Sequence, residues 1–188
     1  MLTEYLNGLQ NISQLSPDSR TALLKHISQK DISKGDYVLK YGEICKHIYY
    51  VNKGFIRIFY FKNGKNITEW FANERQHFFS ITSYFNETPS NLVIEAIEDS
   101  EIILLSKTGL EKLRKTNIEI ANLMIKFFSR SLMLSQQRME SVQFETAKQR
   151  YTKLLEDQPE ILNKVPLQFI ATFLGITKET LSRIRAQI

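Results

Sequence analysis

The sequence predicts an α+β protein with an N-terminal jelly-roll-like β-barrel, a long central dimerisation helix and a C-terminal helix-turn-helix domain. Three observations predict this order. Short β-rich segments fill residues 31 to about 106, a long helical pattern follows residue 110, and two amphipathic helices joined by a glycine end the sequence. We therefore expect three units, at residues 1–115, 116–143 and 144–188.

The composition indicates a globular protein of the cytoplasm with a polyanionic partner. The 188 residues can bury a sizeable core, and a hydrophobic content of 43% argues against disorder. The formal net charge of +5 suits a nucleic acid. Cys45 is the sole cysteine, which excludes an intrachain disulfide and fits a reducing compartment. We expect neither a signal peptide at the first residues nor a membrane span.

The first unit combines short helices with short strands. Residues 2–29 are expected to be helical, with Ser16-Pro17-Asp18 as a helix start. The following segments are rich in β-branched and aromatic residues and are separated by glycine-containing turns, which is typical of a jelly roll. The strands are predicted at residues 36–41, 47–52, 54–61, 67–72, 92–96 and 102–106.

The segment around residues 54–72 gives the clearest local signals in the barrel. Asn63-Gly64 predicts a tight hairpin between its two strands, because both residues accept the positive φ that such a turn needs. Residues 55–61 carry Arg57 as their only charge. We therefore expect this strand to be buried on most of both faces.

The long helix carries a heptad seam, which is a series of residues at alternating spacings of three and four. Residues further upstream, namely Ile118, Ala121 and Met124, prolong this apolar face. The helix could simply pack on its own barrel, but polar residues on its remaining faces favour pairing with a second copy. We expect a homodimer whose interface is formed by the seam residues Ile125, Phe128, Leu132, Ser135, Met139 and Val142.

Residues 167–186 have the pattern of a helix-turn-helix. Ala171 is small enough for a second helix to approach, Gly175 can take the positive φ of a sharp turn, and Thr177 is an N-cap residue. The apolar positions that join the two helices are Ile170, Leu174, Ile176, Leu181 and Ile184. The outward residues, called the reading face below, are Lys178, Glu179, Ser182, Arg183 and Arg185.

The reading face decides between two interpretations of these helices. An ordinary helical hairpin at the end of a domain would explain the apolar positions alone. The reading face adds donors for guanine edges and phosphates together with one carboxylate, which is the mixture that a major-groove reader uses. We therefore favour DNA binding over the alternative, a β-roll sensor or interaction module whose terminal helices bind protein; steep salt dependence would distinguish the two.

Two segments of the barrel carry further motifs: residues 34–43 read KGDYVLKYGE, and residues 47–54 read HIYYVNKG and end in a turn glycine. Together with the terminal motif, these segments resemble the opening of the β-roll and the next hairpin of the Crp/Fnr family of bacterial transcription regulators. The resemblance covers essentially the whole chain. It implies a cyclic-nucleotide-binding-like sensor domain, a homodimer on inverted-repeat operators in double-stranded DNA, and RNA polymerase as a partner.

The resemblance also implies roles for residues of the terminal motif. Lys178, Glu179 and Arg183 match the positions with which the family reads bases. A lysine lacks the planar fork of an arginine, so the preferred half-site is expected to differ from the family's usual one. The residues expected to set register through phosphates are Thr177, Ser182, Arg185 and Gln168.

The sensor pocket departs from the family's pattern. In cyclic-nucleotide-binding relatives a glycine, a glutamate and an arginine hold the ligand; here the matching residues are Ser80, Ile81 and Ser90. Burying a cyclic phosphate without a cation is expensive, and nothing in the spacing brings Arg75 into the pocket. We therefore expect that cyclic AMP is not bound, and the effector is not identified. The pocket is expected at Phe79, Ser80, Ile81, Ser90 and Asn91.

Cofactors and catalysis are not expected. A four-thiolate iron–sulfur cluster is excluded by the single cysteine. The candidates for haem ligation, which are His26, His47, His77 and Cys45, are better explained as ordinary side chains. The scattered histidines do not form a metal-dependent catalytic cluster, and the carboxylates at 95–101 are better explained by a solvated loop. We expect no cofactor, no metal site and no catalytic residue, and hence not an enzyme.

Overall fold

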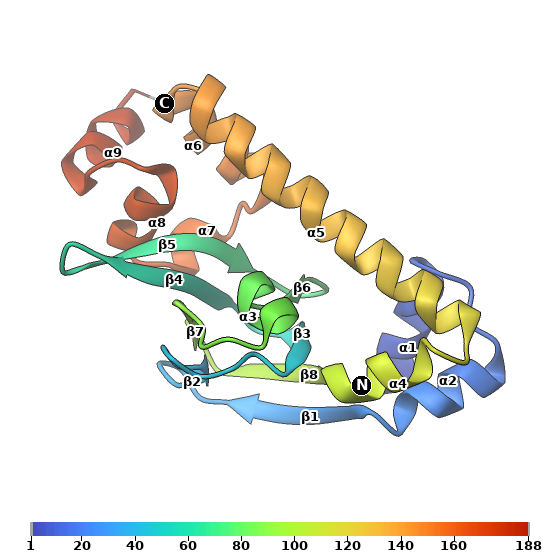
Figure 1. Ribbon diagram of the computed structural model, residues 1–188. Helices are drawn as coiled ribbons and strands as arrows, with labels where there is room; N and C mark the ends of the chain where they lie inside the picture. The colour runs from blue at the N-terminus through green and yellow to red at the C-terminus, as the bar shows by residue number, and fades with distance from the viewer. Residues whose placement is uncertain (1, 188) are drawn as a thin grey trace.

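The computed structural model describes residues 2–187 and shows a β-roll, a long helix and a C-terminal helical group (Figure 1). The long helix, α5 (Ile118–Phe144), leaves the roll diagonally, and the last helices return beside the roll. The other helices are α1 (Leu2–Gln10), α2 (Pro17–Leu24), α3 (Ile81–Asn86), α4 (Lys107–Leu113), α6 (Ala147–Asp157), α7 (Ile161–Lys164), α8 (Leu167–Leu174) and α9 (Lys178–Arg185). This architecture confirms the predicted fold class.

Two four-stranded sheets face each other in the roll. Their orders are β1-β8-β3-β6 and β2-β7-β4-β5, and the paired strands run antiparallel. Aliphatic and aromatic side chains from both sheets form one core, which also takes in residues of α1 and α5. The strands are β1 (Ile27–Ile32), β2 (Tyr37–Leu39), β3 (His47–Lys53), β4 (Ile56–Lys62), β5 (Lys65–Ala72), β6 (His77–Phe78), β7 (Leu92–Ala96) and β8 (Ser100–Ser106).

The predicted hairpin joins β4 and β5. Asn63 and Gly64 have φ angles of 52° and 73°, as the tight turn requires, and Lys62 pairs with Lys65 across it. The expected burial of β4 holds for its first four residues, including the fully buried Arg57. It is wrong near the turn, where Phe61 is 58% exposed, because the end of the hairpin extends beyond the core.

The helical prediction for residues 2–29 is wrong at its end. Residues 27–29 belong to β1, which pairs with β8 along its whole length, from Ile27 opposite Leu105 to Ile32 opposite Ser100. This edge strand exposes most of its side chains, so no alternation of apolar and polar residues marks it in the sequence. The strand predicted at 36–41 is shorter than expected, since β2 covers Tyr37–Leu39 only.

One side of α5 packs on the roll, and the other side is mostly exposed to solvent. Residues on one side, at helical spacing, pack into the core of the roll: Ile120, Leu123, Met124 and Phe127. Met124 was expected to prolong the outward face and instead belongs to this inward stripe. Most seam residues are solvent-exposed, with Ile125 at 61% and Leu132 at 70%. Phe128 is half-buried because its ring lies 4.8 Å from that of Phe85 on α3.

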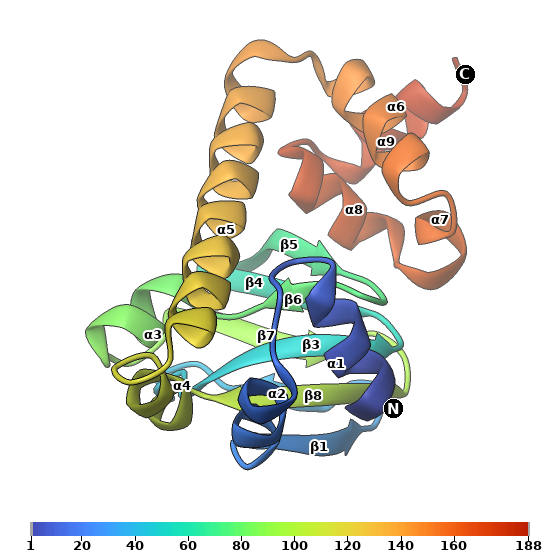
Figure 2. The same cartoon turned by 90° about the vertical axis from the view of Figure 1, so that its right-hand side faces the viewer.

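The C-terminal helical group packs on the roll through a second core. That core contains Phe55, Phe71 and Ile97 of the roll together with the apolar residues of α6 to α9. The helix α8 lies against β5, and Figure 2 shows the group beside α5 and above β4 and β5. The helix-turn-helix is therefore held in a defined position relative to the roll.

Candidate DNA-binding helix and β-roll cavity

The turn between α8 and α9 forms as its sequence predicts. Gly175 caps α8 with a φ of 70°, and its N–H donates to the carbonyl groups of Ala171 and Thr172. The Thr177 hydroxyl accepts a hydrogen bond of 3.2 Å from the backbone N–H of Thr180, which fixes the start of α9. Such a cap contributes about 1 kcal/mol to helix stability.

Burial divides α9 into an anchoring side and a reading face. Leu181 and Ile184 are buried in the second core, and Ala171 of α8 is fully buried where the two helices meet. All five residues of the reading face are exposed. Thr177 and Gln168, which were predicted to contact phosphates, are exposed as well. The structure thus presents the seven predicted DNA-contacting residues to solvent from α8, α9 and the turn between them.

Two charged groups of the reading face, those of Glu179 and Arg183, have local hydrogen-bond partners. Hydrogen bonds from the Glu179 backbone N–H and the Thr177 hydroxyl lower the pKa of the Glu179 carboxyl, and Lys178 and Arg183 add to this effect. The carboxylate therefore stays a hydrogen-bond acceptor at neutral pH. The Arg183 guanidinium donates a hydrogen bond of 3.3 Å to the Thr180 hydroxyl, one turn earlier on α9.

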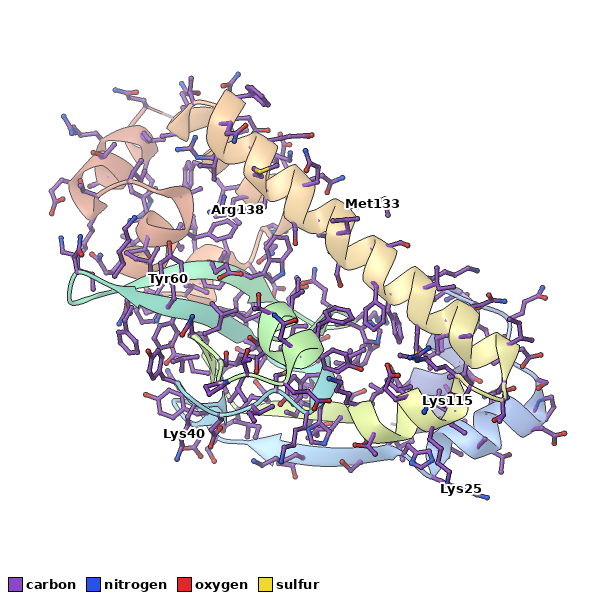
Figure 3. The ribbon with its side chains drawn as sticks, viewed as in Figure 1. Lys25, Lys40, Tyr60, Lys115, Met133 and Arg138 are labelled. Atoms are coloured by element: carbon purple, nitrogen blue, oxygen red, sulfur yellow. The ribbon has the colours of Figure 1, made fainter. Side chains whose placement is uncertain are left out.

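Two arginines outside the motif donate hydrogen bonds to the last carbonyl groups of α8. Arg150 of α6 donates two hydrogen bonds, of 3.1 and 2.9 Å, to the carbonyl of Leu174. Arg138 of α5 donates to the carbonyl of Phe173 and stacks on that ring at 4.1 Å. Figure 3 shows Arg138 on the side of α5 that faces the C-terminal group, and Met133 on the other side. Sequence analysis missed both arginines, since nothing in their spacing points to α8.

A cavity of about 440 Å³ lies between the roll, α3 and α5. Its lining includes the five predicted pocket residues, which are Phe79, Ser80, Ile81, Ser90 and Asn91. Aromatic side chains of the strands, such as Trp70 and Phe78, form other parts of its wall. Three further lining residues come from the long helix: Ser131, Leu134 and Ser135. The contribution of α5 was not expected from the sequence.

The cavity offers hydroxyl groups where an anion would need a cation. Ser80 and Ser90 are buried, and their hydroxyls are 2.9 Å apart in a hydrogen bond. Among the described residues, no lysine or arginine lines the cavity, and Arg75 is not part of the lining. Burial, with a smaller contribution from Arg130, lowers the pKa of His77 to about 3, so its ring is neutral. A buried phosphate would therefore lack a counter-charge here.

The histidines and the cysteine each have partners that are typical of structural residues. His47 starts β3 and His77 starts β6, where the His77 Nε2 is 3.0 Å from the Tyr5 hydroxyl. The Cys45 thiol is buried, donates to the carbonyl of His47 and has a pKa raised by that burial. The ring of His26 packs directly against Gly109. Within residues 2–187, no group of three histidine, cysteine, aspartate or glutamate side chains could hold a metal ion.

The carboxylates at 95–101 have separate partners rather than a common site. Glu95 pairs with Arg57 at 2.9 Å and Glu98 with Lys164 at 2.9 Å. Asp99 accepts from the backbone N–H of Lys34, and Glu101 accepts from the side-chain amide of Asn52. None of the helices described between residues 2 and 187 is long and apolar enough to cross a membrane.

One family model matches most of the roll. Residues 29–117 are similar to the model of the cyclic nucleotide-binding domain. A cAMP-dependent protein kinase regulatory subunit of Debaryomyces hansenii is 24% identical over 120 residues, which are 64% of this chain. The match spans about a quarter of that protein's length, 26%. The similarity therefore concerns only part of the kinase subunit.

Two further comparisons extend over the helix-turn-helix. The HTH-type transcriptional regulator ArcR of Staphylococcus epidermidis is 24% identical over 200 aligned residues, covering 97% of this chain and 82% of ArcR. A solved structure assigned to the Crp/Fnr family of transcriptional regulators, from Eubacterium rectale, superposes with a TM-score of 0.71 at 16% identity. That superposition covers 92% of this chain and 83% of the other, and it shows that the two share one fold.

Proposed function

We propose that this chain, which has the Crp/Fnr fold and carries a cyclic nucleotide-binding domain, is a homodimeric, sequence-specific DNA-binding transcription regulator. It is not an enzyme, it works in the cytoplasm, and it acts on transcription together with RNA polymerase. The observation that carries this proposal is the exposed reading face on a helix whose other side is anchored by Leu181 and Ile184. A helix with this division of burial can enter a major groove without unfolding its own domain.

Each residue of the reading face has a proposed task. Lys178 and Arg183 donate to guanine edges, and Glu179 accepts from a cytosine amine. Phosphates are held by the remaining exposed polar residues, which are Thr177, Ser182, Arg185 and Gln168. Phosphate contacts fix the register of the protein on the duplex, so that the three base-reading residues meet the intended base pairs.

The exposed seam of α5 supports the homodimer. Leu132 is 70% exposed, Val142 53% and Met139 48%, which is unusual for large apolar residues on one stripe of a helix. Pairing of two copies through this stripe would bury it and relate the two α9 helices by a two-fold axis. The operator is then an inverted repeat with half-sites about one turn of DNA, roughly 10–10.5 bp, apart.

The cavity supports a regulator that does not respond to cyclic AMP. A cyclic phosphate carries a full negative charge, and the position that would need an arginine is occupied by Ser90, which is already bonded to Ser80. The effector that fills the cavity is therefore of other chemistry. Contact of Ser131 and Ser135 with the cavity gives its occupant access to the helix that would form the dimer.

The test is selection of bound sequences from randomised double-stranded DNA, followed by affinity measurements over a range of salt concentrations. We expect enrichment of an inverted repeat and an affinity that falls steeply with salt, because bound lysines and arginines release counterions. The matched control is Lys25→Ala, since Figure 3 places Lys25 at the far end of the roll from α9. Absence of an enriched sequence, with salt-independent association, would instead favour protein binding by the terminal helices.

A further inference from the structure

The outer side of the sheet β2-β7-β4-β5 forms the contact with the helix-turn-helix. We call this surface the docking face and define it by Phe55, Arg57, Thr68, Phe71 and Ile97, all of which are buried. Against it lies one side of α8, with Phe169, Thr172 and Phe173 at helical spacing. The docking face thus belongs to the sensor domain, whereas its occupant belongs to the DNA-binding domain.

Arg57 is the centre of the docking face. Its side chain is fully buried, and each nitrogen of its guanidinium donates one hydrogen bond of 2.9 Å. The acceptors are the Thr68 hydroxyl, the Glu95 carboxylate and the Asn66 side-chain carbonyl. All three acceptors lie on strands of the roll, so the roll alone fixes the orientation of the guanidinium plane.

The flat guanidinium is a platform for α8. Its central carbon lies 3.5 Å from the centroid of the Phe169 ring and 4.4 Å from that of Phe59. This stacking needs a planar cation, and a lysine ammonium cannot provide it. Because the hydrogen bonds fix the plane of Arg57, they also fix where the ring of Phe169 packs.

Further contacts surround this stack. The Thr172 hydroxyl accepts from the Thr68 backbone N–H at 3.2 Å and lies 3.0 Å from the Thr68 hydroxyl. The rings of Phe173 and Phe71 are 5.2 Å apart. Beyond them, Lys164 pairs with Glu98 of the roll at 2.9 Å. These contacts involve α8 and the residues before it, so the reading face on α9 remains exposed while α8 is docked.

The backbone does not fix this arrangement by itself. Between α5 and α6 the chain passes through Glu145, which has extended dihedral angles of −96° and 143°. The long helix is therefore not continuous with the helices that carry the reading face. The direction of α9 relative to α5 depends on side-chain contacts, of which the docking face supplies those centred on Arg57.

We infer that Arg57 and Phe169 are positioning residues for operator recognition: the docking face holds the helix-turn-helix in its DNA-reading orientation and so sets the half-site spacing that the dimer accepts. This inference rests on the proposed function. Neither residue touches DNA. Without their stack the two reading helices would still read their half-sites, but the distance between them would no longer be fixed.

The first experiment measures binding to operators that keep the half-sites and change the spacer one base pair at a time. We expect the wild type to prefer one spacing by more than about tenfold, because two rigidly linked sites bind together only when the geometry fits. Arg57→Met and Phe169→Ala should reduce this preference to less than about threefold and leave half-site base preference and salt dependence unchanged. Arg57→Lys keeps the charge without the platform, so it resembles Arg57→Met. Phe169→Ala leaves the hydrogen bonds of Arg57 intact, which guards against a folding defect.

The second experiment locks α8 on the docking face. Thr68→Cys with Thr172→Cys, in a Cys45→Ser background, allows one disulfide at the position of the two neighbouring hydroxyls. Oxidation is expected to preserve operator binding and to restore spacing preference when Phe169→Ala is also present. The matched control is the same protein after reduction.

Three results would overturn the inference. Spacing preference could persist in both Arg57→Met and Phe169→Ala, or the oxidised protein could lose operator binding and recover it on reduction. In either case the wild type binds DNA, so only the inference fails. A wild type that binds no DNA at any spacing contradicts the proposed function itself, and the inference with it.

Discussion

The reading face of α9 and the cavity of the roll differ in how each departs from the pattern of its relatives. The reading face keeps a cation, a carboxylate and a second cation at Lys178, Glu179 and Arg183, all exposed. The cavity has Ser80, Ile81 and Ser90 where cyclic-nucleotide-binding relatives have a glycine, a glutamate and an arginine. Exchanging an exposed arginine for lysine keeps the charge and loses only the planar fork, so we expect it to change base preference. A buried phosphate depends on its counter-charge, so we expect the absence of the arginine to prevent binding of cyclic AMP.

Dissociation of the dimer, which separates its two α9 helices, should have the largest effect on DNA affinity. Leu132→Glu with Met139→Glu places charges on the exposed seam and is expected to dissociate the dimer. Affinity for the full operator should then fall by more than about 100-fold, since each half-site binds alone. Light scattering gives the mass and titration gives the affinity. The control is Met133→Glu, which is 58% exposed but lies outside the heptad positions of the seam. An unchanged dimer mass for the double variant would show that the seam is not the dimer interface.

The second prediction concerns binding of cyclic AMP in the cavity. The wild type should show no rise in melting temperature at millimolar cyclic AMP. The variant Ser80→Gly/Ile81→Glu/Ser90→Arg restores the family's groups and should bind, with a stabilisation of about 2.7 kcal/mol at 100 times the dissociation constant. Adenosine is the control ligand, because it lacks the phosphate. Saturable binding of cyclic AMP by the wild type would contradict our interpretation of the pocket.

Substitutions on α9 should separate base reading from phosphate binding. Arg183→Ala is expected to cost about 1–3 kcal/mol and to relax preference at one base pair of each half-site. Arg185→Ala should weaken all sequences alike and reduce the salt slope by about one. Lys178→Ala should have a smaller effect on preference, because its donor is on a flexible stem. Competition binding on a randomised half-site library measures all three; if Arg185→Ala alone shifts base preference, the two arginines have exchanged roles.

The effect that we expect to be smallest near neutral pH is the pH dependence of stability that His77, at the wall of the cavity, causes. Burial lowers the pKa of His77 from 6.5 to about 3, so the unfolded chain binds a proton between these values and the folded chain does not. Stability should therefore fall as the pH decreases from 6.5 towards 3, by up to about 1.4 kcal/mol per pH unit for this group. Chemical denaturation at several pH values measures it. His77→Gln should have a shallower slope over this range; an equal slope would assign the dependence to other groups.

Local signals predicted the parts of the fold that depend on a few neighbouring residues. The turn at Gly175, the cap at Thr177 and the hairpin at Asn63-Gly64 all require particular backbone conformations. These residue types favour those conformations, so the sequence predicts them. The exposed reading face follows from helical periodicity once those boundaries are known. The predicted pocket residues also line one cavity, because the resemblance to a family supplied their alignment.

Contacts between distant segments could not be predicted in this way. The strand β1 exists through backbone hydrogen bonds to β8, which no side-chain pattern records. The acceptors of Arg57 lie on two other strands, and Phe169 belongs to α8. A single charge in an apolar strand therefore predicts burial but does not predict the residues that contact it. The DNA contacts and the dimer remain predictions, since they concern surfaces that the chain leaves open.

One stripe of α5 connects two distant parts of the molecule. Ser131, Leu134 and Ser135 line the cavity, and Arg138, one turn further on, holds the end of α8. Their spacing places these four side chains on one side of the helix. An α-helix is stiff over such a length, so rotation of α5 about its axis turns all four through the same angle. An occupant of the cavity and the C-terminal end of α8 therefore contact the same side of α5.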